Sequence, residues 1–278
     1  MAEITAALVK QLRDATNVSM MDCKRALVET EGDVDKAALI LRERGMAVAA
    51  KRATRTANQG LIASACSDDG RIASLIEVNC ETDFVARNEN FATFVASLAD
   101  EACRTDDALA ETLKDDVTAK IGEIGENIVV KRNTRFALQD GGTLASYIHL
   151  GGKVGVLLEL GCEKQETADN AAFNELARDL TLHVAACNPT ALTADEVPPQ
   201  DIEAERAIYA KQVADKPPQI IGKIVEGKIK KYLGEICLLN QGFVKEPKQS
   251  ATALLEEKGK ELTDTVTIRR FVRYQLGG

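Results

Sequence analysis

Two histidines and seven cysteines are the residues of this chain whose types suit nucleophilic catalysis or metal binding. Neither His149 nor His183 has carboxylate or cysteine partners at metal-ligand spacing, and His183, among apolar neighbours, is expected in the core or at its boundary. The cysteines form no CxxC pair and are odd in number, so reduced, mostly buried thiols are expected. No general base accompanies Cys23 or Cys80, and no glycine-rich phosphate loop occurs. We therefore predict no catalytic residue, no metal site and no cofactor.

The stretch NCETDFVARNENF, residues 79–91, suggests binding rather than catalysis. Thr82 and Asp83 are residue types that begin helices, so Phe84 is expected near an exposed helix start, where a large apolar ring is rarely placed. We interpret Phe84 as a side chain that enters an apolar pocket of another molecule. The alternative is a ring that packs against the start of its own helix.

The elements that must position this stretch occur twice in the sequence. An ungapped alignment that places Glu77 on Glu159 pairs two hairpins of β-runs around a glycine turn, LIASAC-SDDG-RIASLIEV and LASYIHL-GGK-VGVLLEL. A helix follows each hairpin, near Phe91 or Phe173. A third pair of strands, IVVKRNTRFAL and VTIRRFVRYQL, matches at a longer offset, which places Arg132 on Arg270. The sequence therefore predicts two related α+β units.

The two copies differ at the position of Phe84. Where the first copy has Thr82-Asp83-Phe84-Val85, the second has Lys164-Gln165-Glu166-Thr167, whereas the flanking Cys-Glu and Ala-x-Asn residues agree. The fold therefore does not require phenylalanine here, and the side chain is expected to face solvent in both copies.

The remaining segments flank or interrupt the duplication. Residues before Gly45 have the spacing of three short helices, with Gly45 as the end of the third. A basic connector with some helical character is expected over 46–58. Because the third strands match at a longer offset than the hairpins, the second copy contains an insertion between Cys187 and Val266. DIEAERAIYAKQV, DKPP and IIGKIVEGKIKKYL predict that it contains a helical hairpin, in which Ile202, Tyr209 and Val213 face Ile221, Val225 and Ile229.

We thus predict an α+β protein with three-stranded sheets, which the tight glycine turns favour as antiparallel over a parallel α/β arrangement. Its predicted parts are an N-terminal three-helix module (1–54), a first core subdomain (55–140), a second core subdomain (141–187 and 234–278) and an inserted helical hairpin (188–233).

Composition favours a protein partner. The net charge of -8 and the pI near 5.1 argue against a protein whose main task is to bind nucleic acid, because phosphate binding relies on clustered Lys and Arg. The N-terminus lacks the pattern of a signal peptide, and no run of about 18 apolar residues suggests a membrane span. We expect a cytoplasmic protein that binds neither membrane nor nucleic acid.

Six segments carry a family resemblance that covers nearly the whole chain: MAEITAALVKQLRDATNVSMMDCKRAL, NCETDFVARN, KIGEIGENI, HVAACNP, KIVEGKIKKYLGEICLLNQGFVKEP and FVRY. These segments, in the order in which they occur, resemble the bacterial elongation factor Ts family. Members of that family are guanine nucleotide exchange factors of the translational GTPase elongation factor Tu. The resemblance implies elongation factor Tu, GDP-bound or nucleotide-free, as the partner, and no covalent chemistry. The resemblance also implies a coiled-coil arm, which serves as a homodimer contact in some members. The N-terminal three-helix module by itself resembles ubiquitin-associated domains.

The resemblance also implies residue roles. In the family, the TDFV block enters the nucleotide domain of the GTPase and disturbs its magnesium site, which here implies Thr82, Asp83, Phe84 and Val85. Further implied contacts are Leu12, Met20, Met21, Lys24, Ile124, Gly125, His149 and Val244. Two departures suggest a different grip on the GTPase: the sequence stops soon after FVRY, where longer members continue, and Gly242 and Lys245 replace a proline and an often apolar residue.

A second hypothesis comes from another functional class. The three-helix module and the duplicated core are also compatible with a protein-binding adaptor that has no exchange activity. The two hypotheses differ in whether GDP release from elongation factor Tu is accelerated.

Overall fold

The computed structural model describes residues 4–16, 18–105 and 109–278. The chain divides into two compact units, which we describe separately. Unit 1 holds residues 1–63, 76–133 and 276–278, and unit 2 holds residues 64–75 and 134–275. The finer domain boundaries predicted from the sequence remain predictions.

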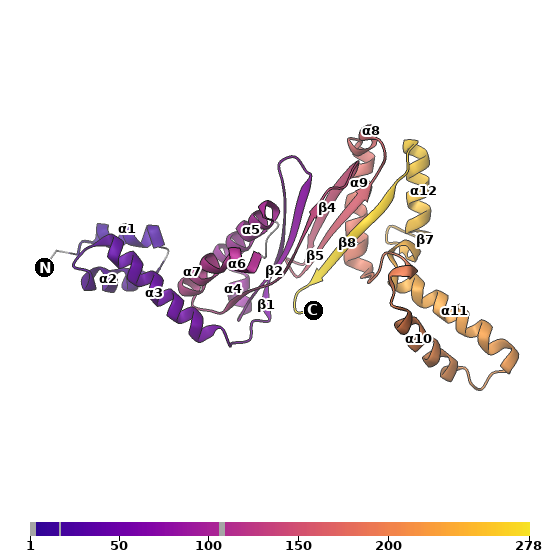
Figure 1. The fold of residues 1–278 in the computed structure, drawn as a ribbon, viewed down its shortest axis with the longest axis horizontal. Helices are drawn as coiled ribbons and strands as arrows, with labels where there is room; N and C mark the ends of the chain where they lie inside the picture. The colour runs from indigo at the N-terminus through magenta and orange to yellow at the C-terminus, as the bar shows by residue number, and fades with distance from the viewer. Residues whose placement is uncertain (1–3, 17, 106–108) are drawn as a thin grey trace. The chain divides into compact units, whose positions relative to one another are not determined.

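Three helices begin unit 1: α1 (Ala6–Thr16), α2 (Met20–Glu29) and α3 (Val34–Arg52) (Figure 1). Ser19 caps α2, because its hydroxyl accepts a hydrogen bond of 3.2 Å from the Asp22 N–H. The helices share a core of small and medium apolar side chains: Val9, Leu12, Cys23, Ala26, Leu27, Ala37 and Leu41. The predicted three-helix arrangement is confirmed.

The prediction that Gly45 ends the third helix is wrong, because α3 continues to Arg52. Gly45 instead lies where α3 meets α7 (Lys114–Ile124). A Cβ atom added to Gly122 of α7 would come within 2.9 Å of the Gly45 Cα. The two glycines therefore allow a close approach of two helix backbones. The sequence around Gly45 does not reveal this packing role, because the partner glycine is distant in the chain.

Each half of the repeat forms a three-stranded sheet with its second strand in the middle. The first sheet has the order β1 (Gln59–Cys66), β2 (Ile72–Cys80), β3 (Ile128–Ala137), and the second has the order β4 (Gly142–His149), β5 (Val154–Gly161), β8 (Thr267–Gln275). In the second sheet β5 is antiparallel to both neighbours. The predicted α+β class with antiparallel sheets is confirmed.

Helices follow the strands at matching places in both copies. The first copy has α4 (Asp83–Ala86), α5 (Glu89–Arg104), α6 (Leu109–Thr112) and α7; the second has α8 (Gln165–Ala168), α9 (Ala171–Cys187) and α12 (Ala251–Leu262). In unit 2, α9 lies against β4 and β5 (Figure 1). Its apolar face packs on alternate residues of β5 in one core: Val156, Leu158, Leu160, Phe173, Leu176, Leu180 and Val184.

Each unit also buries one glutamate that is paired with arginine. The fully buried carboxylate of Glu77 accepts a 2.8 Å hydrogen bond from Arg132 Nε, and that of Glu159 accepts one of 2.7 Å from Arg270 Nε. The repeat itself equates the two glutamates and the two arginines. Because an unpaired buried charge is strongly unfavourable, each pair fixes its third strand against the central one.

The insertion of unit 2 contains the predicted hairpin, α10 (Pro199–Gln212) and α11 (Pro218–Ile236), which run side by side in opposite directions (Figure 1). Its two apolar stripes face each other as predicted: Ile202, Tyr209 and Val213 against Ile221, Val225 and Ile229. The sequence did not predict the short segments that follow: the 3-10 turn η2 (Leu238–Asn240), β6 (Gly242–Phe243) and β7 (Glu246–Ser250).

Alanine substitutions of the two packed glycines are expected to have opposite effects on stability. A Cβ on Gly45 would meet the Gly122 Cα at an ordinary 3.8 Å, so Gly45→Ala is expected to stabilise α3 by about 0.5–1 kcal/mol. Gly122→Ala is expected to destabilise the protein by about 1–3 kcal/mol, because its Cβ would overlap backbone. Urea unfolding of both variants measures the difference. Equal effects would contradict the packing role.

Candidate partner-binding site

Phe84 lies at the tip where β2 leaves the first sheet. Thr82 caps the short helix α4, and its hydroxyl accepts a hydrogen bond of 3.4 Å from the Val85 N–H. The Phe84 side chain is 83% exposed, more than any other large apolar side chain in the described residues. Asp83 forms an ion pair of 3.0 Å with Arg87 beside it. The expectation that Phe84 faces solvent is confirmed, and the ring contributes nothing to the core of its own unit.

The tip is held by the carboxylate of Glu126, a residue that the sequence alone did not single out. This carboxylate accepts hydrogen bonds from the Glu81 N–H at 3.1 Å, the Thr82 N–H at 3.0 Å and the Thr82 hydroxyl at 2.6 Å. A carboxylate that accepts three bonds from one turn fixes the backbone there. Phe84 therefore projects from a constrained tip rather than from a free loop.

A second carboxylate completes the link in the opposite direction. Glu81 Oε1 accepts a hydrogen bond of 2.7 Å from the Asn127 N–H, and Glu81 also forms ion pairs of 3.3 Å with Arg52 and Arg55. The bond from Asn127, followed by those from the arginines, holds the pKa of Glu81 below its usual value. Residues 81–82 and 126–127 thus bind each other through two reciprocal carboxylates.

Cys80, immediately before the tip, has a structural role. Its thiol donates a hydrogen bond of 3.2 Å to the Thr82 carbonyl. Burial, followed by the nearby Glu126 carboxylate, raises the pKa of Cys80 to about 12. The residue is therefore a neutral thiol at physiological pH, and it does not have the thiolate character that a nucleophile needs.

The second copy has the same support without the aromatic ring. Asp264 accepts hydrogen bonds from the Glu163 N–H at 3.2 Å and the Lys164 N–H at 3.0 Å, and the Cys162 thiol donates to the Lys164 carbonyl at 3.3 Å. The alignment of the third strands, extended toward the N-terminus, places Asp264 on Glu126. The duplicated support thus carries Phe84 in one unit and Glu166 in the other.

The other residues implied by the resemblance occupy different parts of the chain. Met20 and Met21, at the start of α2, are 44% and 65% exposed, and Lys24 on the same helix is exposed. Leu12 differs, because its side chain is fully buried in the core of the three helices. The structure therefore offers the two methionines and the lysine to a partner, and the contact role of Leu12 stays a prediction.

Two further implied residues adjoin the Phe84 tip. Ile124 ends α7, and Gly125 caps it in the left-handed conformation with φ of 78°, which a residue with a side chain rarely adopts. They directly precede Glu126, so the hydrogen bonds of that carboxylate bring the IGEN turn and the TDFV block together in unit 1.

Unit 2 contains the last two implied residues. His149 ends β4 and is exposed, and its Nδ1 lies 2.9 Å from the Tyr147 hydroxyl. Val244, 40% exposed, lies between β6 and β7. The Gly242 and Lys245 departures have local explanations. A Cβ on Gly242 would lie 2.5 Å from the Pro247 carbonyl oxygen, and Lys245 forms an ion pair of 2.6 Å with Asp179.

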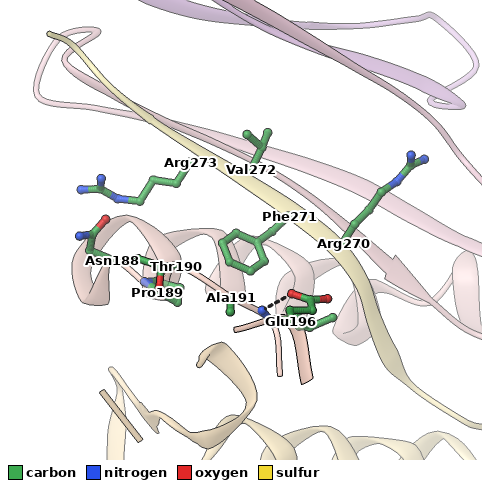
Figure 2. A pocket seen from close by; sticks show the side chains of 10 residues that line it. Asn188, Pro189, Thr190, Ala191, Glu196, Arg270, Phe271, Val272 and Arg273 are labelled. Carbon is green, nitrogen blue, oxygen red and sulfur yellow. Dashed lines mark hydrogen bonds between the residues drawn. The ribbon is translucent and has the colours of Figure 1, made fainter. Parts of the chain in front are cut away.

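A hollow of about 420 Å³ lies in unit 2 (Figure 2). It is lined by residues 188–192, Glu196 and residues 270–273. Its one carboxylate, that of Glu196, accepts a hydrogen bond of 2.7 Å from the Leu192 N–H, and the lining holds no histidine or cysteine. The Glu196 carboxylate is thus bonded to the backbone of the same lining.

The part of the chain that the structure describes contains neither a cluster of metal-binding side chains nor a membrane-spanning helix. These residues hold no group of three His, Cys, Asp or Glu side chains placed to bind a metal ion. Within the same residues, no helix is both long and apolar enough to span a bilayer.

Comparison with known proteins gives one family over nearly the whole chain. The family described as Elongation factor TS matches residues 81–278. The protein called elongation factor Ts from Clostridium perfringens (strain SM101 / Type A) is 43% identical to this chain, over 99% of this chain and 93% of its own length. The one from Nitratidesulfovibrio vulgaris (strain DP4) is 41% identical, over 99% of this chain and 96% of its own length. The relative from Clostridium novyi (strain NT) is 42% identical, over 99% of this chain and 93% of its own. The chain therefore belongs to the elongation factor Ts family of guanine nucleotide exchange factors.

Proposed function

We propose that this protein accelerates GDP release from elongation factor Tu by inserting Phe84 into the nucleotide domain of that GTPase. The observation that carries the proposal is the tip itself: a phenylalanine, 83% exposed, on a backbone held by three hydrogen bonds to Glu126. A constrained apolar side chain loses little conformational entropy on entering a pocket, so more of its burial energy is available for binding. The sister tip, with Glu166, shows that the scaffold folds without an aromatic ring.

The mechanism follows from how a GTPase holds GDP. A magnesium ion neutralises phosphate charge, and its ligands must keep a near-ideal octahedral geometry. A ring wedged between nearby helices, with Asp83 beside it and with Thr82 and Val85 shaping the loop, displaces those ligands. The phosphate charge is then poorly neutralised, and GDP leaves faster. Because binding couplings are reciprocal, GDP weakens the binding of this protein to the GTPase by the same factor by which this protein weakens the binding of GDP.

The proposal assigns no covalent chemistry to this chain. The partner is elongation factor Tu, either GDP-bound or nucleotide-free, in the cytoplasm, and the protein contacts neither nucleic acid nor membrane. Met20, Met21 and Lys24 on α2 form a second contact, because flexible methionine side chains adapt to an apolar partner surface. His149 and Val244 contribute from unit 2.

We also propose that the α10–α11 arm forms a homodimer contact. The buried stripe of the arm is satisfied within the hairpin, so the contact would use outer side chains such as Ile208 and Ile220, which are 47% and 43% exposed. Sedimentation of the protein with and without residues 199–233 tests this contact. The same number of subunits in both forms would contradict it.

Phe84→Ala is expected to reduce the rate of GDP release from elongation factor Tu without destabilising the free protein. A hot-spot side chain of this kind contributes about 2 kcal/mol or more, which is about thirtyfold in the second-order rate constant. Stopped-flow release of fluorescent GDP, measured against factor concentration, gives this constant. The melting temperature should stay nearly unchanged, because the ring is outside the core.

Glu166→Ala at the sister tip is the matched control and should leave GDP release unchanged. Tight binding of the unsubstituted protein to elongation factor Tu without any acceleration of release would favour the adaptor hypothesis instead. A large loss of stability in Phe84→Ala would indicate that the ring supports its own fold.

Glu126→Ala is expected to slow exchange even though Phe84 is still present. The change removes the acceptor of three donors, and such losses cost about 1–3 kcal/mol when the donors are screened from water. The loosened tip must then be ordered on binding. In the Phe84→Ala background the same change should add little, because the two residues act as one device.

Asp264→Ala is the control for Glu126→Ala, because it releases the equivalent backbone donors of the sister tip. It should lower stability to a similar extent in urea unfolding while leaving GDP release intact. Equal losses of exchange from the two variants would show that Glu126 acts through general stability alone.

A further inference from the structure

The loop between β6 and β7 leaves Val244 without a ladder partner for its N–H. The two short strands pair Gly242 with Ser250 and Phe243 with Glu246, and the register shifts between these pairs. Val244, next in sequence, exposes 40% of its surface. Its N–H donates a hydrogen bond of 3.1 Å to Nδ1 of His183, on helix α9. The backbone of an exposed apolar residue is thus fixed by a fully buried imidazole.

The hydrogen bonds define the state of this imidazole. A backbone N–H can only donate, so Nδ1 of His183 accepts and carries no proton. The ring proton therefore lies on Nε2, which donates to Gln241 Oε1 at 3.0 Å. The Gln241 amide in turn donates to the carbonyls of Glu235, at 2.7 Å, and Cys187, at 3.3 Å. Burial lowers the pKa of His183, in agreement with a neutral ring that uses both nitrogens.

The residues on either side of Val244 are fixed to the same helix. The Phe243 side chain is buried in the core of unit 2, and its ring centroid lies 5.7 Å from that of His183. Lys245 forms an ion pair with Asp179, which lies one helical turn before His183 on α9. Three consecutive loop residues are therefore held by one helix, and among them the Val244 side chain is apolar, exposed and outside the core.

We propose that His183 is a positioning residue that presents Val244 to the partner GTPase. The inference rests on the proposed function, because it takes Val244 as a contact of elongation factor Tu. Without the acceptor on His183, the Val244 N–H must turn toward water, and the peptide that carries the valine rotates with it. His183 touches no partner atom, and its effect reaches the interface only through the backbone of this loop.

Two substitutions separate positioning from core packing. The side-chain amide of asparagine places an oxygen near the position of Nδ1, so His183→Asn keeps an acceptor for Val244 and loses the bond to Gln241. The longer glutamine places its amide near Nε2, so His183→Gln keeps the bond to Gln241 and loses the acceptor for Val244. Both variants replace a buried ring with a smaller polar group, so both are expected to lower stability.

Three readouts test the proposal. The second-order rate constant for release of fluorescent GDP should fall about tenfold in His183→Gln and be largely restored in His183→Asn. Hydrogen exchange of the Val244 amide, followed by NMR, should accelerate in the glutamine variant alone. In a Val244→Ala background, His183→Gln should cause little further loss of rate, because the valine through which it acts is gone.

Each contrary result has a distinct meaning. If the two variants lose rate equally, or each loses rate only as far as its melting temperature falls, the proposal is overturned in favour of a packing role. A full rate in Val244→Ala would also overturn it, because the loop would then make no contact, while exchange driven by Phe84 would stand. The proposed function fails on different results: no acceleration of GDP release by the unsubstituted protein, or an unchanged rate in Phe84→Ala.

Discussion

The carboxylate of Glu126 is the interaction on which the candidate site depends. An isolated four-residue helix such as α4 is not stable in water, because one helical turn fixes several dihedral angles for few hydrogen bonds. The hydrogen bonds from three donors to Glu126, together with the Thr82 cap, stabilise this short helix, which has few hydrogen bonds of its own. Without them an exposed phenylalanine would sit on a mobile turn, where its ring would have many orientations and a pocket could use few.

Duplication explains how such a tip arises without cost to the fold. The two copies keep the acidic support, the thiol that donates to the tip carbonyl and the glutamate–arginine pair of the sheet. These contacts involve buried or backbone groups, whose loss leaves polar atoms unsatisfied. The exposed position between them is free of that constraint. One copy therefore carries Phe84 and the other Glu166 on closely similar supports.

The sequence predicts most of the fold because the fold repeats. Periodicity and the internal alignment locate the sheets, the three N-terminal helices, the helix after each β-hairpin and the α10–α11 hairpin. The difference between copies identifies Phe84 as solvent-facing. The failures concern contacts between segments distant in sequence. Gly45 resembles a helix end in the sequence, because its packing partner, Gly122, lies on another helix. The role of Glu126 is not predictable from the sequence, because a carboxylate that binds backbone N–H groups has no local sequence pattern.

The same limit applies to His183. It was expected in the core or at its boundary and is fully buried, but its hydrogen-bond partners are not visible in the sequence. Its bonds join α9 to Gln241 and Val244, which lie beyond the whole α10–α11 hairpin in the chain. A hydrophobic residue of similar volume would fill the space, yet it would leave the Val244 N–H without a partner. Polar groups in a core therefore have a use that packing does not supply. They fix the direction of a backbone group at the surface, as the buried His183 does at the Val244 loop; the half-buried Glu126 does the same at the Phe84 tip.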